Sequence, residues 1–351
     1  MKMSQLAVAF VLSFVFSTVQ ATITFSGGIW FNYSYLTETD EDNFGDEALV
    51  LYLDGKPNKR SENWRYSAEV RFGPGGFSDK DNNSSGDYSV IHKAWIAFDF
   101  DKKHSVTIGK SQVPFAWKTE NFWPGDMFQA AYGDQMDVGI KYDAKYRSFD
   151  MSLAYFHADD WGSTSTDSTD DNRHWGSSTT YRKVRTWVAD FRVPVVKNQI
   201  VALSLQSGEL EELITANRET DGQHQAAVLY YLGNWKQFQL KAEYIWGERD
   251  LPSIYVQQTG LSETIENRRL GFEFIYDWDQ WQFILDATWA FPDTEGNDAD
   301  TIVAYAPGVK FDYGPGWVYL EYLNQDGWID RNMQIHEGDF SAWYLTFDFY
   351  F

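Results

Sequence analysis

The chain ends in SAWYLTFDFYF, from Ser341 to Phe351, where two kinds of side chain alternate. In an extended strand, successive side chains point to opposite faces. One face is entirely apolar and consists of Trp343, Leu345, Phe347, Phe349 and Phe351. The other face consists of Tyr344, Thr346, Asp348 and Tyr350. Such a strand would aggregate in water unless its edge is paired and its apolar face is covered.

The same alternation recurs along the chain in segments of about ten residues, which is typical of strands that cross a membrane. Clear examples are WRYSAEVRF (Trp64–Phe72), WKQFQLKAEYIW (Trp235–Trp246) and WQFILDATW (Trp281–Trp289). Their apolar rows carry aromatic residues at the ends, and the opposite rows carry charges of both signs. The pattern predicts sixteen strands, beginning near Ile23, Glu47, Trp64, Ser89, His104, Gln135, Ser148, Tyr181, Gln199, His224, Trp235, Glu266, Gln280, Thr301, Trp317 and Phe340.

Short and long connections alternate between these strands. Short gaps include 101–103, 233–234, 277–279 and 313–316, whereas the long polar connections include 159–179, 208–221, 249–264, 292–300 and 324–338. Outer-membrane barrels show this alternation of short periplasmic turns and long external loops. We therefore predict an all-β fold, a transmembrane antiparallel up-and-down β-barrel of about 16 strands, rather than a water-soluble sandwich with one dry core. Lipid would cover the last strand, and the first strand would close its edge.

The first residues predict export. MKMSQLAVAFVLSFVFSTVQA has a basic start at Lys2, an apolar run from Leu6 to Phe16 and small residues before Ala21, which is the pattern of a signal peptide. The apolar run is shorter than the roughly 20 residues of a membrane-spanning helix, so we expect cleavage after residue 21 rather than an anchor. The remaining residues, 22–351, are predicted to form a single barrel domain in the bacterial outer membrane.

Composition excludes several classes of protein. The chain has no cysteine, so packing and backbone pairing rather than disulfides must stabilise it. Its 29 basic and 51 acidic side chains give a net charge of −22, and loss of Lys2 with the signal peptide makes it −23. An acidic chain of this kind is not expected to bind nucleic acid.

The connection from Ser111 to Gln135 differs from the other long loops because it is aromatic and apolar. Its aromatic residues need shelter, which folding inward against the barrel wall would supply. A lid packed over the mouth is the alternative. We expect the inward fold, and the candidate constriction residues are Trp117, Lys118, Glu120, Trp123 and Asp126.

The stretch KAWIAFDFDKKHSVTIGKSQVPFAW, Lys93–Trp117, carries a Gly-x-x-x-x-Pro-Phe motif at Gly109, Pro114 and Phe115. It resembles the corresponding segment of Gram-negative porins related to the phosphate-selective porins O and P. The resemblance implies a homotrimeric outer-membrane channel. Phosphate selectivity in that family depends on dense basic residues along the pore. The connection Ser111–Gln135 has only one, Lys118, so the resemblance does not lead us to expect phosphate selectivity here.

The last residue, Phe351, resembles the C-terminal signal read by the outer-membrane assembly machinery. We therefore predict an assembly role for Phe351 rather than a binding role.

Strand phase predicts which side chains line the interior. The wall candidates are Arg65, Glu69, Arg71, Lys93, Trp95, Asp99, Lys141, Arg182, Arg192, Lys241, Glu243, Arg269, Glu273, Lys310 and Glu321. Strand phase also places five further acidic residues inside, Asp137, Asp150, Asp190, Asp286 and Asp348. The interior then has nine basic and ten acidic candidates, so most of the acidic excess falls in loops, where it would concentrate cations at the mouth. Opposed basic and acidic residues could set a transverse field across the constriction. Alternatively, pairs such as Glu69 with Arg71 neutralise each other as ordinary wall structure.

These features predict a water-filled porin for passive diffusion of small hydrophilic solutes and ions, with weak cation selectivity. A solute-specific channel for oligosaccharide or for anions such as phosphate is the first alternative, and an outer-membrane hydrolase is a weaker one. The six histidines are scattered and form no catalytic or metal-binding pattern, so no enzyme activity, cofactor or metal is predicted. The expected partners are the lipid bilayer, lipopolysaccharide and further copies of the chain.

Overall fold

The computed structural model describes residues 21–57, 63–76, 78, 83–121, 135–159, 180–292, 295–297 and 299–351. Most of the predicted signal peptide lies outside these residues, so its cleavage stays a prediction. No helix in the described ranges is long and apolar enough to cross a membrane.

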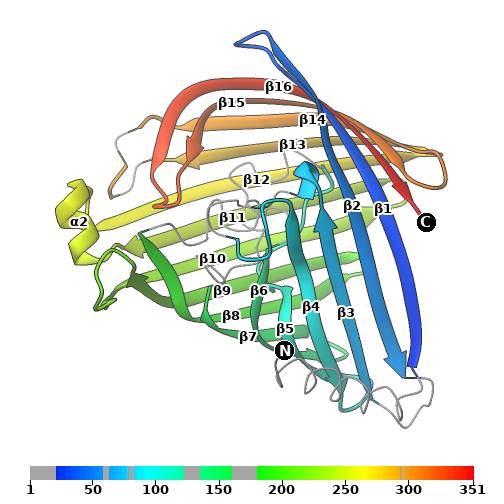
Figure 1. Ribbon diagram of the computed structural model, residues 1–351, viewed down its shortest axis with the longest axis horizontal. Helices are drawn as coiled ribbons and strands as arrows, with labels where there is room; N and C mark the ends of the chain where they lie inside the picture. Colours follow the sequence, from blue (N-terminus) through cyan, green and yellow to red (C-terminus); the bar gives the residue numbers. More distant parts are fainter. Residues whose placement is uncertain are drawn as a thin grey trace, which may run out of the picture.

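Sixteen strands of the described chain form one closed barrel (Figure 1). They are β1 (Ala21–Leu36), β2 (Glu41–Pro57), β3 (Trp64–Phe72), β4 (Ser89–Asp99), β5 (His104–Gln112), β6 (Met136–Lys145), β7 (Asp150–Ala158), β8 (Tyr181–Val196), β9 (Gln199–Glu212), β10 (Thr220–Trp235), β11 (Phe238–Asp250), β12 (Thr264–Trp278), β13 (Trp281–Phe291), β14 (Ile302–Asp312), β15 (Trp317–Ile329) and β16 (Ile335–Tyr350). Each strand pairs antiparallel with its neighbours in the chain, and β1 pairs with β16. The predicted fold class is confirmed.

Short helical segments also occur in the connections. The 3-10 turn η1 (Pro74–Gly76) follows β3. Helix α2 (Ser253–Thr259) connects β11 to β12 and lies beyond the ends of these strands (Figure 1). Gly260 caps the C-terminal end of α2, and its φ of 72° is the left-handed conformation that glycine adopts most readily.

Strand starts agree closely with the alternation, and the larger differences occur where polar residues extend a hairpin. Strand β2 begins at Glu41, six residues before the predicted start, because the acidic stretch Glu41–Gly45 continues the pairing with β1. The predicted turn at 233–234 is wrong: Gly233 pairs with Leu240, and the chain turns at Lys236, which has a φ of 55°.

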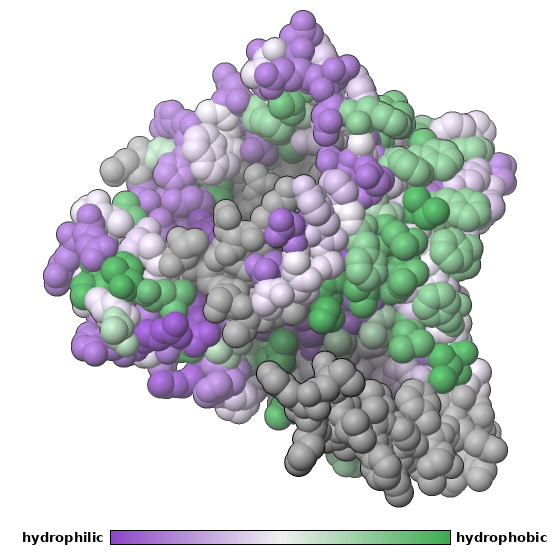
Figure 2. All heavy atoms as spheres, in the orientation of Figure 1, coloured by the Kyte–Doolittle hydropathy of each residue, from purple (hydrophilic) through white to green (hydrophobic). Residues whose placement is uncertain are grey.

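The two faces of the wall differ as the alternation predicts. In β16, Leu345 and Phe347 are 40% and 43% exposed, whereas Thr346 and Asp348 are 0% and 2% exposed. In Figure 2 apolar side chains gather over the β1 and β2 side of the molecule, and hydrophilic ones gather at the tip of the β1–β2 hairpin. The outer face is therefore an apolar band, and the charged rows point inward.

Closure joins the two ends of the described chain. Strands β1 and β16 are in register from Gly28 opposite Tyr350 to Leu36 opposite Ala342. Beyond that ladder, the Gly27 N–H donates to the Phe351 carbonyl at 2.9 Å, and the Phe351 N–H donates to the Gly27 carbonyl at 3.0 Å. The last strand thus has no unpaired edge over this span, and this answers the aggregation problem that its sequence poses.

Candidate functional site

The chain leaves the wall for the interior just after a tightly packed glycine. Gly109 in β5 has a φ of 117°, and a Cβ atom there would lie 2.4 Å from the Ala94 carbonyl oxygen of the neighbouring strand β4. Only glycine fits both the conformation and the space. Three residues later β5 ends at Gln112, and the chain continues into residues 113–121, which we call the inward segment.

Apolar packing holds the first half of the inward segment. Val113, Phe115 and Trp117 are at most 5% exposed. They belong to one buried cluster with inward-facing residues of β7 to β11, which are Ala154, Phe156, Val188, Ala202, Leu210, Ala226, Val228, Tyr230 and Ile245. The interior therefore has an apolar wall on this side, and the aromatic loop residues are sheltered against it.

Polar contacts fix the backbone of the same half to the wall. The Ala116 N–H donates to Ser204 Oγ of β9 at 2.9 Å, and the Lys241 ammonium of β11 donates to the Lys118 carbonyl at 2.7 Å. The first contact satisfies the N–H of the buried Ala116, and the second ties the exposed Lys118 to the wall.

The second half reaches the next strands along the wall. The Glu120 N–H donates to Glu273 Oε2 of β12 at 2.6 Å, and the Glu120 carboxylate pairs with Lys310 of β14 at 2.9 Å. Asn121 donates to Asp286 of β13, and its amide also donates to the Ala306 carbonyl of β14 at 3.1 Å. The inward segment thus lies across the inner face from β8 to β14.

Three of the five predicted constriction residues are described. Trp117 is buried beneath Lys241, whose ammonium lies 5.3 Å from a ring centroid; Lys118 is exposed, and Glu120 is partly exposed. Trp123 and Asp126 lie outside the described residues, so their position in a constriction stays a prediction, as does the inward fold of the whole segment 111–135. Asn121 was not predicted, because an isolated asparagine in a loop carries no signal.

Ion pairs join nine of the charged wall candidates to partners on the wall or on the inward segment. The pairs are Arg65–Asp99 (3.4 Å), Arg71–Glu69 (2.9 Å), Lys93–Glu69 (3.8 Å), Arg192–Asp190 (2.6 Å), Lys241–Glu273 (2.6 Å) and Lys310–Glu120 (2.9 Å). Among the remaining candidates, Glu243, Arg269 and Glu321 are buried on the inner face, and Lys141 donates to the Gln112 carbonyl at 3.0 Å. Six basic side chains of the interior are therefore paired in place with five carboxylates.

Aromatic rings also contact these basic groups. Cation–ring distances of 4.9–6.0 Å join Arg65 to Trp95, Arg71 to Trp30, Lys93 to Tyr52, Arg192 to Tyr230 and Lys310 to Trp317. Such contacts attract a cation to the ring face and hold the side chain against the wall. Trp95 has this role on the wall, whereas Trp30, Tyr52 and Trp317 were not predicted, because their strands carry aromatics on both faces.

One wall prediction is wrong. Arg182 lies on the opposite face of β8 from Tyr181 and Lys183, which are 0% and 5% exposed, so it points outward, where it pairs with Glu211 at 2.7 Å. The register of β8 and β9 shifts between Val184 and Trp187, so the phase read from the second half of β8 does not apply to its first half.

One acidic residue of the mouth is held by hydrogen bonds. Glu38, in the turn between β1 and β2, accepts a hydrogen bond from Ser341 Oγ at 2.7 Å. Hydrogen bonds from the Ser341 backbone and side chain hold the pKa of Glu38 below its usual value. In the described part of the chain, no group of three His, Asp or Glu side chains is placed to hold a metal ion.

No protein-family model matches the chain, and no curated protein matches its sequence. Solved structures do share the fold. A loop L8 deletion mutant of OmpT, an outer membrane protein of Vibrio cholerae, has a TM-score of 0.64 at 12% identity, over 94% of this chain and 99% of that one. The outer membrane channel DcaP of Acinetobacter baumannii has a TM-score of 0.62 at 9% identity, over 94% of this chain and 97% of that one. The anion-selective porin from Comamonas acidovorans has a TM-score of 0.61 at 11% identity, over 95% of this chain and 100% of that one.

These similarities extend over almost the whole of each chain, so the architecture is that of outer-membrane porins and channels. At such low identities the likeness establishes the fold alone.

Proposed function

We propose that the mature chain is an outer-membrane porin, a water-filled channel for passive diffusion of small hydrophilic solutes and ions. The observation that supports this most is the closed sixteen-stranded barrel whose outer face is apolar and whose inner face is charged. A barrel of this strand number leaves an aqueous interior instead of filling it with side chains. By the same reasoning the chain inserts in the outer membrane, contacts lipopolysaccharide there and assembles as a homotrimer, as the resemblance to porins implies.

The channel is weakly cation-selective in this proposal. Basic residues of the wall are paired with carboxylates at 2.6–3.8 Å and lie against aromatic rings, so they present little net positive charge to a passing anion. The acidic excess of the chain and the ionised Glu38 at the mouth raise the local concentration of cations.

A solute-specific channel is the alternative that one observation favours. Rings on the inner face, such as Trp95 and Trp317, lie beside charged groups, and that combination suits stacking on sugar faces. Phosphate selectivity, the property of the porins that the Gly109–Phe115 motif resembles, is a weaker candidate because the basic groups are already paired. We do not propose an enzyme activity.

The test is single-channel recording of the purified protein in a planar bilayer, first in salt alone and then with added maltooligosaccharide or phosphate. The proposal predicts stable conductance steps that neither additive blocks. Block by maltooligosaccharide would favour the sugar-specific alternative, and block by phosphate would favour the anion-specific one. A folded protein that gives no conductance would overturn the channel proposal.

A further inference from the structure

The connection between β15 and β16 was predicted to be a long loop, 324–338, but both strands extend into it and leave only residues 330–334 between them. This five-residue connection is braced internally, and we call it the strap. Asp330 Oδ1 accepts the Asn332 N–H at 2.8 Å and the Gln334 N–H at 2.9 Å. The other oxygen of the same carboxylate lies 3.0 Å from His336 Nε2. The strap therefore has a defined shape before any distant contact is considered.

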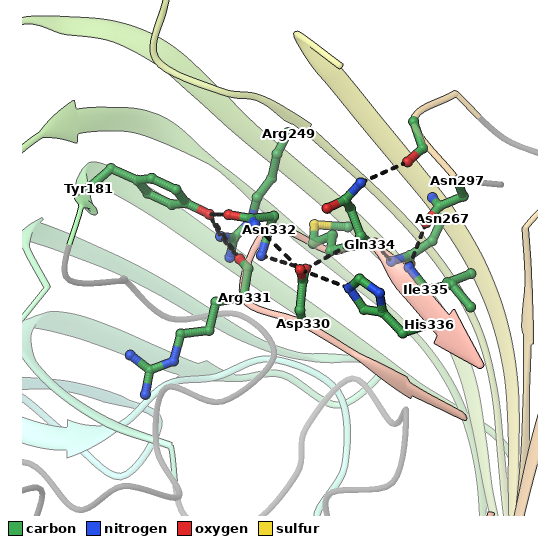
Figure 3. A network of polar contacts seen from close by, with 12 residues as sticks. Tyr181, Arg249, Asn267, Asn297, Asp330, Arg331, Asn332, Gln334, Ile335 and His336 are labelled. Carbon is green, nitrogen blue, oxygen red and sulfur yellow. Dashed lines mark hydrogen bonds and ion pairs between the residues drawn. The ribbon is translucent and has the colours of Figure 1, made fainter. Parts of the chain in front are cut away.

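The tip of the strap is bonded to strands far from its own. Tyr181 of β8 donates from its hydroxyl to the Arg331 carbonyl at 3.0 Å and to Asn332 Oδ1 at 2.7 Å. Arg249 of β11 also donates to the Arg331 carbonyl. Figure 3 shows the side chains of Tyr181 and Arg249 pointing from the wall toward the strap. In the closed strand order β8 is seven strands from β15, so the strap reaches across the interior to the facing wall.

A buried methionine anchors the tip. Met333 is 2% exposed and belongs to the same apolar cluster as Tyr181, Leu251 and Ile265, against which residues of α2 also pack. Asn267 of β12 donates to the Met333 carbonyl at 2.9 Å. At the base of the strap, the Ile335 N–H donates to Asn297 Oδ1 at 2.6 Å. Apolar and polar contacts thus hold the strap at both ends.

The strap lies at the end of the barrel that carries the long connections. It follows β15 as the inward segment follows β5, so both enter from the same end. The strap ends near the start of β8 and the end of β11, whereas the inward segment contacts Arg192 of β8 and Lys241 of β11, nearer the opposite ends of these strands. The two elements therefore lie at different depths along the path of a solute.

We propose that the strap is a second constriction, nearer the mouth than the inward segment, and that it sets the size limit of the solutes that enter. The inference rests on the proposed channel function. When two constrictions lie in series, the narrower one determines which solutes pass. Figure 3 shows the Arg331 side chain extending away from the network of Tyr181, Arg249 and Asn332.

Two variants release the strap in different ways. In the first, residues 331–333 are replaced by Asn-Gly, a two-residue turn that suits an antiparallel hairpin and leaves β15 and β16 in register. In the second, Met333→Asp places a carboxylate in the apolar cluster, which opposes burial of the tip. Met333→Leu is the matched control because it keeps the volume and the apolar character.

Each purified protein is recorded in planar bilayers with polyethylene glycols of graded size, after its folding is checked by resistance to unfolding in detergent. We expect both released variants to conduct about 1.5-fold more than wild type or better, and to admit larger polymers, with Met333→Leu unchanged. Folded variants with the wild-type conductance and polymer limit would overturn the strap proposal while leaving the channel intact. Absence of conductance in all the proteins would overturn the channel proposal, and the strap proposal with it.

Discussion

Gly109 shows how one residue without a side chain determines where the chain can leave the wall. Its φ of 117° and the Ala94 carbonyl oxygen, 2.4 Å from the place that a Cβ would occupy, leave no room for a larger residue. We predict that Gly109→Ala lowers the free energy of unfolding by about 1–3 kcal/mol, the range for a residue forced into an unfavourable backbone conformation. Denaturant unfolding of the purified barrel in detergent measures this. Gly45→Ala is the control, because a Cβ there meets nothing within 4 Å; equal effects of the two substitutions would contradict the prediction.

The pair of Glu120 and Lys310 joins the inward segment to β14 at 2.9 Å and keeps their charges in balance. Glu120→Gln removes the negative partner, so Lys310 would repel cations at this depth. We predict a lower cation-to-anion permeability ratio for Glu120→Gln, with recovery in the double variant Glu120→Gln/Lys310→Met. Reversal potentials in a salt gradient report both. A ratio that does not change in the single variant would show that this pair lies away from the ion path.

The last residue, Phe351, extends the pairing that closes the barrel. Phe351 makes two backbone hydrogen bonds with Gly27, at 2.9 and 3.0 Å, beyond the ladder that closes β1 on β16. Deletion of Phe351 removes both bonds and exposes part of the β1 edge. We predict a lower yield of folded barrel in the outer membrane, whereas Phe351→Tyr, which keeps the backbone and the ring, stays near wild type. The measurement is the heat-resistant fraction in isolated membranes, and equal yields would argue against an assembly role.

How far the sequence predicts each element depends on whether its two faces differ. Strand β3 could be placed with its phase because Arg65, Glu69 and Arg71 oppose an apolar row. Strand β10 is apolar on both faces, with Ala226 and Val228 inside and Leu229 outside, so its contribution to the inner apolar wall could not be predicted. The register shift in β8 reversed the phase of Arg182, and no residue pattern announces such a shift.

Loops carry the remaining differences. The aromatic content of the inward segment indicates burial, but the strap is a polar stretch in which Met333 alone hints at an apolar contact. Its docking on β8, β11 and β12 depends on how the closed barrel brings distant strands face to face. Contacts of this kind arise from closure of the whole sheet, so local periodicity does not contain them.

At the scale of the whole molecule, the charges are arranged as a neutralised wall beneath an acidic mouth. The chain has a net charge of −22, yet its interior pairs nearly equal numbers of basic and acidic groups. The field that a permeating ion meets should therefore come mainly from the loops, and it should weaken as salt screens it. We therefore predict weak selectivity for cations, stronger at low ionic strength.

The most direct test is the reversal potential of the purified wild-type protein in a planar bilayer that separates concentrated from dilute potassium chloride. The proposed channel predicts that the dilute side becomes positive, because cations cross more readily than anions, and that the effect decreases as both solutions are made more concentrated. A dilute side that becomes negative would contradict the proposal, since it would mean that the paired basic residues of the wall still attract anions.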